Sequence, residues 1–353
     1  MKIKNYIEAL EEYIPGFQPD LNDPEVIKLN ANENAYPPSP KIEEVIKNMD
    51  INKLRIYPKA MSDDLRKAIA SVYKTDFNQV FCGNGSDEII SLIMKVFLEE
   101  GGTVVAPYPT YTVYKACANI EGVDCEFVDV NDDFTIDVDK LLKAKSEAIF
   151  LANPNAPTGI LLSIEKIKYI LDNYDGLVVV DEAYMDFCDE DATMIKYIND
   201  YSNLVVMRTM SKSYSLCGAR LGYCFADKRL IRYLDKCRDS YNINYMTQIV
   251  ASAAVLDEEY HLKIIDKIKE NRKYLFEKLE EMNFKCIPSQ TNFILCTPSG
   301  NKSAKEIMEG LKKYKIYIRY FESRNLSDKL RITVGTKEEI DKLIKAMKEV
   351  IAE

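Results

Sequence analysis

Histidine and tryptophan are scarce in this chain of 353 residues, which contains one histidine and no tryptophan. Metal sites built from several histidines are therefore excluded, and a hydrolase with a histidine base would depend on His261 alone. Apolar residues recur at helical spacing around His261, in residues 258–275, which predicts a helix residue rather than a catalyst. If the protein is an enzyme, we expect another group to move its protons, and we expect no metal.

Long apolar runs and a paired cysteine pattern are also lacking. No stretch of about eighteen uncharged apolar residues occurs, and the first residues contain no apolar core of signal-peptide length, so we expect a cytoplasmic protein without membrane partners. The nine cysteines are an odd number and include no C-x-x-C pair. A chain of this length can fold without crosslinks, and we predict reduced, mostly buried thiols.

Positive charge is in deficit, since Lys and Arg total 47 against 56 Asp and Glu, for a net charge of −9. An acidic chain has no overall attraction for nucleic acid or anionic lipid, so neither is expected as a partner. The apolar fraction of 47% and the charged fraction of 29% are typical of a globular protein and not of a disordered chain.

Short apolar runs alternate with helical patterns between about residues 85 and 226. This alternation predicts an α/β domain with a mostly parallel sheet covered by helices. The runs are 103–106, 125–130, 148–152, 177–180, 203–208 and 221–226. Beyond them, a long helical stretch at 227–282 is followed by strand patterns at 293–296, 316–319 and 330–334, a helix at 302–313 and a terminal helix from 336.

These patterns divide the chain into two expected domains. We predict a large α/β domain at 41–240 and a smaller α+β domain at 241–353, because strict alternation ends after the first. Residues 1–40 are rich in Pro, Asn and Glu, and we expect them to form an N-terminal arm and a piece of the smaller domain.

Polar residues directly follow three of the apolar runs. In an open α/β sheet, ligands bind outside the carboxyl ends of the strands. Each residue alone has a plain explanation as a turn former, a helix cap or a solvated side chain. Together they place an amide, a carboxylate, a phenol, hydroxyls and an amine at one sheet edge, which indicates a site. The residues are Asn155, Asp181, Tyr184, Thr209, Ser211 and Lys212.

A glycine-containing turn at 83–88 leads into an apolar helical pattern. Gly85, Ser86 and Asp87 would leave free N–H groups at a helix start, where a phosphate could bind, although an ordinary capped turn is equally compatible. The turn lacks both the dinucleotide fingerprint and the Walker loop. A lysine, a carboxylate and a phosphate site without histidine suit an aldehyde cofactor held as a Schiff base, which is pyridoxal phosphate.

Residues 211–222, Ser-Lys-Ser-Tyr-Ser-Leu-Cys-Gly-Ala-Arg-Leu-Gly, resemble the lysine motif of class I and II aminotransferases. The turn at 85–88, the N-x-P-T-G loop and Asp-Glu-Ala-Tyr at 181–184 occur in that family's order, and the resemblance covers essentially the whole chain. It implies the fold type I architecture of aspartate aminotransferase. Residues 29–34, Tyr57–Pro58 and 330–336 most resemble the subfamily that transfers amino groups between glutamate and histidinol phosphate.

The resemblance also implies how the cofactor is held. Lys212 would bind its aldehyde and then shuttle the proton, Asp181 would keep the pyridine nitrogen protonated, and Tyr111 would stack on the ring. Tyr184 and Asn155 would hydrogen-bond the phenolic oxygen, although Ala156 stands directly before P-T-G, where many relatives have asparagine. The phosphate would be bound by Gly85, Ser86, Asp87, Thr209, Ser211 and Arg220, and by Tyr57 from the neighbouring subunit of a homodimer.

For the substrate, the resemblance implies that Arg331 binds an anionic group, with Arg319, Tyr13 and Asn32 completing the recognition set. An arginine fork suits carboxylate and phosphate alike. From the sequence, a surface strand position is nearly as compatible with Arg319.

Other functions stay open at this point. An aromatic-amino-acid aminotransferase or a threonine-phosphate decarboxylase would use the same scaffold, because fold does not fix function. A cofactor-binding regulator without turnover is disfavoured because Lys212, Asp181 and Arg331 occur together. An NAD-type oxidoreductase is disfavoured by the missing glycine fingerprint.

Overall fold

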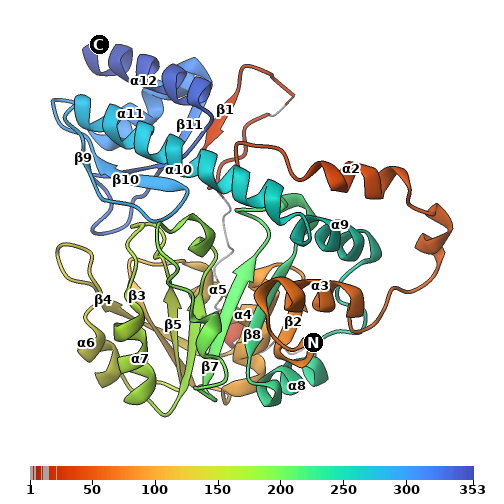
Figure 1. Ribbon diagram of the computed structural model, residues 1–353. Coiled ribbons are helices and arrows are strands. Elements are labelled where there is room, and N and C mark those ends of the chain that lie inside the picture. Colours follow the sequence, from red (N-terminus) through yellow and green to blue (C-terminus); the bar gives the residue numbers. More distant parts are fainter. Residues whose placement is uncertain (1–2, 4, 9, 11–15, 21) are drawn as a thin grey trace.

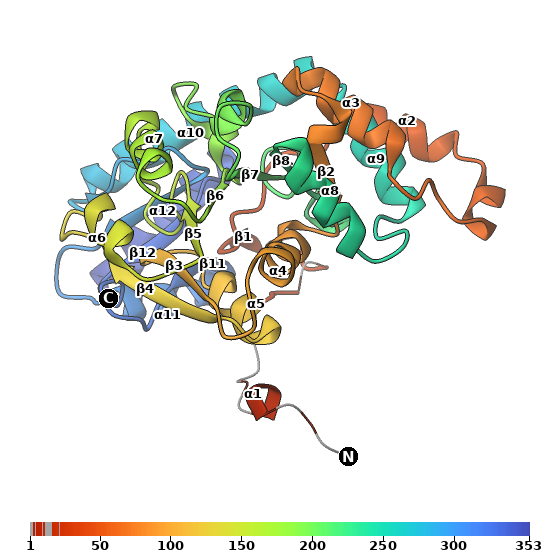
Figure 2. The ribbon, with the colours of Figure 1, turned by 90° about the horizontal axis from the view of Figure 1, so that it is seen from below.

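The computed structural model describes residues 3, 5–8, 10, 16–20 and 22–353. Within them the strands form two sheets, a seven-stranded one in the lower half of Figure 1 and a five-stranded one at its upper left. The short helix α1 (Asn5–Glu8) lies apart from both sheets and contacts α5, as Figure 2 shows. None of the helices in the described part of the chain combines the length and apolar character needed to span a membrane.

The seven-stranded sheet has the order β2-β8-β7-β6-β5-β3-β4. Its strands from β3 to β7 run parallel, and β8 is antiparallel to both of its neighbours. The strands are β2 (Val80–Gly83), β3 (Thr103–Tyr108), β4 (Asp124–Asp129), β5 (Ala148–Ala152), β6 (Leu177–Asp181), β7 (Leu204–Thr209) and β8 (Gly222–Ala226). All six predicted runs are strands here, and the mostly parallel sheet is confirmed.

Helices cover both faces of this sheet. One core includes residues of α2 (Pro40–Lys47), α3 (Asp63–Tyr73), α6 (Val138–Lys143), α7 (Ile164–Asp172) and α9 (Tyr245–Val255). The opposite core includes residues of α4 (Ser86–Phe97), α5 (Val113–Glu121) and α8 (Lys228–Cys237). Every residue of β5, β6 and β7 is buried, which explains why these strands read as continuous apolar runs in the sequence.

The smaller sheet has the order β1-β11-β12-β10-β9, with α10, α11 and α12 contributing to its core. The strand β1 (Ile27–Leu29) pairs parallel with β11 (Ile316–Tyr320), so a segment from the first forty residues completes a sheet of C-terminal strands. The remaining elements are β9 (Lys285–Cys286), β10 (Phe293–Thr297), β12 (Leu330–Thr333), α10 (Glu258–Glu281), α11 (Ala304–Leu311) and α12 (Lys337–Ala352). The domain boundaries at residues 40 and 240 stay a prediction.

The predicted helical stretch at 227–282 consists of three helices, α8, α9 and α10. Asn244 separates the first two, because its side chain accepts a hydrogen bond from the Thr247 amide and starts α9. His261 lies in α10 as predicted. All nine cysteines are free, and five of them are buried.

Candidate active site

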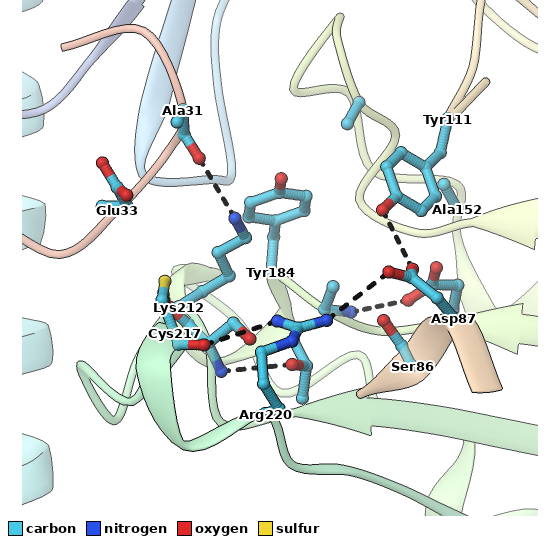
Figure 3. A pocket seen from close by; sticks show the side chains of 15 residues that line it. Ala31, Glu33, Ser86, Asp87, Tyr111, Ala152, Tyr184, Lys212, Cys217 and Arg220 are labelled. Carbon is cyan, nitrogen blue, oxygen red and sulfur yellow. Dashed lines mark hydrogen bonds and ion pairs between the residues drawn. The ribbon is translucent and has the colours of Figure 1, made fainter. Parts of the chain in front are cut away.

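A cavity of about 200 Å³ opens at the carboxyl ends of the parallel strands (Figure 3). Its walls come from the ends of β5, β6 and β7, from the start of α4 and from the segment after β1. The structure brings together at this cavity most of the residues expected from the sequence. They are Ser86, Asp87, Tyr111, Asp181, Tyr184, Thr209, Ser211, Lys212 and Arg220.

Lys212 follows β7, and its amine points across the cavity to the Ala31 carbonyl oxygen, to which Nζ donates a hydrogen bond of 3.2 Å. The backbone around it is held from two sides. Asn34 Nδ2 donates to the carbonyl oxygens of Lys212 and Ser213 at 3.1 and 3.2 Å. Ser213 Oγ donates to Asp186 at 2.5 Å. The amine therefore projects from a loop with a fixed main chain.

A buried charge network contacts the Lys212 loop through Asp186. The Arg208 guanidinium binds Glu182 at 2.9 Å and Asp186 at 2.5 Å, and all three side chains are largely buried. Although burial opposes it, Arg208 beside Asp186 lowers the pKa of that carboxyl. Removing one partner of such a buried pair typically costs about 3–5 kcal/mol. The network therefore fixes the loop rather than exchanging protons with a substrate.

His261 packs against the same network, outside the cavity. Its ring stacks on Tyr214 with centroids 3.8 Å apart, and Nε2 lies 3.7 Å from Asp186. Burial lowers the pKa of His261, so the ring stays neutral. The one histidine of the chain is thus a packed helix residue, in agreement with the sequence interpretation.

Asp181 ends β6 at the floor of the cavity and is almost completely buried. One carboxylate oxygen accepts a hydrogen bond from the Tyr114 hydroxyl at 2.9 Å, and the other accepts one from the Ala183 amide at 3.1 Å. Burial raises the pKa of Asp181 to about 6, while the two donors oppose this rise. The carboxylate is therefore charged at neutral pH. Tyr114, on α5, was not expected from the sequence.

The start of α4 forms one end of the cavity. Its N-cap is Gly85, which has φ of 85° and no side chain to cap the helix, so no cap side chain satisfies the first N–H groups. A Cβ atom on Gly85 would lie 2.6 Å from Arg220, and one on Gly222 would lie 2.5 Å from the Gly85 carbonyl carbon. Only glycines at both positions let Arg220, β8 and the helix start converge, which produces an anion-binding end.

Asp87 contributes a side chain that was not expected, since the sequence pointed only to its amide. Arg220 lies 3.5 Å from the Asp87 carboxylate, and the Tyr111 hydroxyl donates to the same carboxylate at 3.1 Å (Figure 3). Burial, with Asp87 nearby, raises the pKa of Tyr111. The Tyr111 hydroxyl is therefore a permanent donor, and its ring forms one wall of the cavity.

Asn155 does not reach the cavity, which corrects the expectation from the resemblance. Its Nδ2 donates to the Pro109 carbonyl at 2.9 Å and to Thr158 Oγ1 at 3.0 Å, while Oδ1 accepts from Thr110. Both amide hydrogens are used inside the loop, and the neighbouring Ala156 lines the cavity instead. Because the asparagine stands one position earlier than in many relatives, the residue directly before P-T-G offers no polar side chain to the cavity.

Tyr57 was expected to reach the cofactor phosphate of the neighbouring subunit and not that of its own chain. Tyr57 is 80% exposed, stacks on Tyr241 with centroids 4.5 Å apart, and lines neither this cavity nor the one beside it. Tyr13 lies outside the described residues.

A second cavity of about 250 Å³ adjoins the first and shares Tyr111, Tyr184 and Lys212 with it. Asn32 lines this cavity, and its Nδ2 donates to the Tyr184 hydroxyl at 2.9 Å, which links the two. Arg319 and Arg331, which the resemblance assigns to the substrate, lie on its wall.

Arg319 and Arg331 are direct cross-strand partners in β11 and β12. Within the described part of the chain neither forms an ion pair with a carboxylate, and Arg331 Nε is buried without a hydrogen-bond partner. Both guanidinium groups lie near the ring of Phe321, with their central carbons 5.3 and 5.4 Å from its centre. Burial, with Arg319 nearby, lowers the pKa of Arg331 to about 10, which still leaves it charged. Two like charges without a counter-ion indicate an anion site.

Comparisons with known proteins agree with this geometry. The family model for aminotransferase class I and II matches residues 24–347. A histidinol-phosphate aminotransferase from Clostridium botulinum (strain Okra / Type B1) is 39% identical over 98% of both chains. Histidinol-phosphate aminotransferase 1 from Nostoc sp. is 37% identical over 99% of this chain and 98% of its own. The crystal structure of histidinol-phosphate aminotransferase from Sinorhizobium meliloti in complex with pyridoxal-5'-phosphate superimposes with a TM-score of 0.91, 25% identity, and coverage of 99% and 98%.

Proposed function

Since this chain belongs to the class I and II aminotransferase family, we propose that it transfers an amino group between L-glutamate and imidazole-acetol phosphate, giving histidinol phosphate, in the cytoplasm. One observation carries the substrate assignment. Arg319 and Arg331 are cross-strand partners in a cavity that also contains Lys212, and no carboxylate of the described residues pairs with either of them. A phosphate dianion would satisfy both cations, and the amine to be transferred would then lie on the Lys212 side.

The cofactor is pyridoxal phosphate, and the residues of the first cavity fit it. The helix start and Arg220 offer N–H donors and a positive charge to a phosphate, and Asp181 offers a buried negative charge to a ring nitrogen. Pyridoxal phosphate supplies an aldehyde that carries the amino group and a ring that withdraws electrons from the substrate Cα. The phosphate site and the negative charge for the ring nitrogen lie at opposite ends of one cavity that also contains a lysine.

Each side chain has a defined task in this proposal. Lys212 would hold the aldehyde, and its free amine would move the proton at the substrate Cα. Asp181 holds the ring nitrogen in its protonated form through charge. The Tyr184 hydroxyl accepts from Asn32 and so keeps its own hydrogen free to donate to the phenolic oxygen. With Asn155 engaged in its loop, Tyr184 is the residue that we assign to this contact.

The second cavity has to accept two substrates in turn, glutamate and the phosphate ester. Both carry a terminal anion, and a guanidinium fork binds carboxylate and phosphate equally well. One pair of arginines, placed side by side by the pairing of β11 with β12, can therefore serve both half-reactions.

Substitution of Arg331 by alanine is expected to lower kcat/KM for histidinol phosphate about 10- to 150-fold, because a charged hydrogen bond contributes about 1.5–3 kcal/mol. The kcat/KM of Arg331→Lys should lie between those of the wild type and Arg331→Ala, since lysine keeps the positive charge but lacks the two-pronged guanidinium group. The cofactor absorption spectrum should stay unchanged, because Arg331 lines the second cavity only. Arg229→Ala on exposed α8 is the control. Unchanged steady-state kinetics for Arg331→Ala would remove it from the substrate site.

The runner-up functions are separated by comparing three substrates. We expect kcat/KM for histidinol phosphate to exceed that for phenylalanine, and we expect no CO₂ release from phosphothreonine. An equal or higher kcat/KM for phenylalanine would make the protein an aromatic-amino-acid aminotransferase. Release of CO₂ would make it a decarboxylase. A bound cofactor whose spectrum responds to none of these compounds would favour a regulator.

We also propose that the chain forms a homodimer through the segment between α2 and α3. Four apolar or aromatic side chains are exposed there, and the segment protrudes at the right of Figure 1. Exposed apolar patches of this kind mark interaction surfaces. The side chains are Ile51 at 69% exposure, Leu54 at 52%, Ile56 at 57% and Tyr57 at 80%.

Mixing two defective variants tests the dimer and the role of Tyr57 together. Tyr57→Phe should weaken cofactor binding about 10- to 150-fold by loss of a hydrogen bond to phosphate. Subunits with Lys212→Ala still carry Tyr57, so mixed dimers should regain one site with full cofactor affinity and turnover. Sedimentation velocity gives the oligomeric state in parallel. A monomer, or a mixture no more active than Tyr57→Phe alone, would refute this arrangement.

A further inference from the structure

A completely buried hydroxyl lies behind the cavity. Tyr114 has no exposed surface, and its ring contacts Phe150 with centroids 5.3 Å apart. Its hydroxyl donates to Asp181 Oδ2 at 2.9 Å. A buried hydroxyl has to find a partner, and here the partner is the carboxylate at the floor of the cavity.

The start of α5 places Tyr114 next to Tyr111. The Tyr114 amide donates to the Tyr111 carbonyl at 3.3 Å, so the two residues occupy one helical turn and share a face. Their rings meet edge to face, with centroids 5.6 Å apart and planes at 89°. Tyr114 therefore contacts both Tyr111, which walls the cavity, and Asp181, which forms its floor.

We infer that Tyr114 is a positioning residue that holds the Asp181 carboxylate ionised and aimed into the cavity, so that the cofactor ring nitrogen keeps its proton. This inference rests on the proposed function. The Tyr114 hydroxyl and the Ala183 amide bind different carboxylate oxygens, which prevents the group from turning. Hydrogen bonds to the charged form favour that form over the neutral acid.

The surroundings of Asp181 make this support necessary. Burial, together with the adjacent Asp87 charge, raises the pKa of the Asp181 carboxyl to about 6. The Tyr114 and Ala183 hydrogen bonds and the Lys212 amine act in the opposite direction. Burial also raises the pKa of Tyr114 far above its ordinary value, so its hydroxyl donates at every working pH. The other hydroxyls near Tyr114 belong to Tyr111 and Tyr184. Burial raises the pKa of Tyr111 as well.

The first measurement uses the cofactor-free protein and is independent of the proposed function. The ¹³Cγ resonance of Asp181, assigned by difference against Asp181→Asn, is titrated in the wild type and in Tyr114→Phe. We expect the midpoint to rise by about one to two pH units in Tyr114→Phe, because the anion loses a charged hydrogen bond. Tyr174→Phe, which removes a hydrogen-bonded hydroxyl beside the amino end of β5, is the control and should leave the midpoint unchanged.

The second measurement uses the holoenzyme with cofactor labelled with ¹⁵N at the ring nitrogen. In Tyr114→Phe the ¹⁵N shift at neutral pH should move toward the value of unprotonated pyridine, since a more basic carboxylate takes up the shared proton. We expect kcat to fall about 10- to 150-fold with a smaller change in KM. An unchanged Asp181 midpoint would overturn the inference even if activity fell, because Tyr114 would then act through packing alone.

Site-specific 3-fluorotyrosine at position 114 keeps the test open if Tyr114→Phe does not fold. Fluorination makes the hydroxyl a stronger donor, so the Asp181 midpoint should fall instead of rise. A midpoint that does not respond would also overturn the inference. If Asp181 responds as expected but the wild type transfers no amino group to or from histidinol phosphate, the proposed function fails and the Tyr114–Asp181 coupling stands.

Discussion

Replacing Lys212 with alanine is expected to abolish amino transfer and to remove the absorption band of the protein-bound cofactor. Lys212 is the one lysine among the described residues that line either cavity, so no second amine is placed to take over. General acid–base catalysis alone contributes about 10²- to 10⁴-fold, and loss of covalent attachment adds to this. We therefore expect less than about one part in 10⁴ of wild-type kcat to remain.

The control for this experiment is Lys95→Ala, which removes an exposed lysine from α4 at a distance from the helix start. It should retain both the absorption band and turnover. Borohydride reduction followed by peptide mapping would locate the modified lysine directly. Full activity of Lys212→Ala, or labelling of a different lysine, would end the proposed function.

Asp181→Asn is expected to lower kcat about 10- to 1000-fold. The substitution keeps the size of the side chain and removes its charge. An opposite charge at contact shifts a pKa by about 1 to 3 units, and each unit corresponds to a factor of about ten in rate if the protonated ring is required. Asp124→Asn, at the exposed amino end of β4, is the control and should have wild-type kinetics. A kcat within twofold of wild type for Asp181→Asn would show that its charge is not used.

The pH dependence of cofactor binding gives a second test of Asp181. Burial raises the pKa of this carboxyl to about 6, so in the cofactor-free protein it is charged above that pH and neutral below it. Affinity for the cofactor should therefore fall as the pH drops through 6. The cofactor phosphate also takes up a proton near pH 6, at about its second pKa. Only the difference between wild type and Asp181→Asn reports on Asp181, and parallel curves for the two proteins would contradict this interpretation.

The strands of the large sheet could be predicted because they are buried on both faces. Every position in β5, β6 and β7 is buried, which produces continuous apolar runs. The length of such a run is enough to identify it as a strand. Three strands were not predicted. β1 has three residues, β9 has two, and β2 has four that end in the glycine turn before α4. Segments this short carry too few positions to reveal a period.

The site could be predicted where topology alone decides it. Asp181 and Lys212 follow parallel strands, and the carboxyl ends of such strands meet at one edge. Asn155 could not be placed in this way, because a proline-rich loop has no period and a shift of one residue decides which side chain faces inward. Ala156, directly before P-T-G, was the sequence signal for that shift.

Tyr114 and Phe321 depend on tertiary contacts that spacing only hints at. Tyr114 stands three residues after Tyr111 at a helix start, a signal that would have placed both rings on one face. Phe321 stands two residues after Arg319, which puts both side chains on the same side of an extended chain. The pairing of Arg319 with Arg331, which brings both cations near Phe321, is a register that the sequence does not specify.

The place of β1 in the smaller sheet has a consequence for how the protein forms on the ribosome. This strand is made before every strand of the large sheet, and its partner β11 is made after all of them. Synthesis proceeds at roughly 5–20 residues per second, so β1 waits many seconds while the large sheet assembles. Asn32 and Asn34, which follow β1 and bind Tyr184 and the Lys212 loop, can reach their positions only afterwards. These contacts of the proposed catalytic centre therefore form only after β11 has been made.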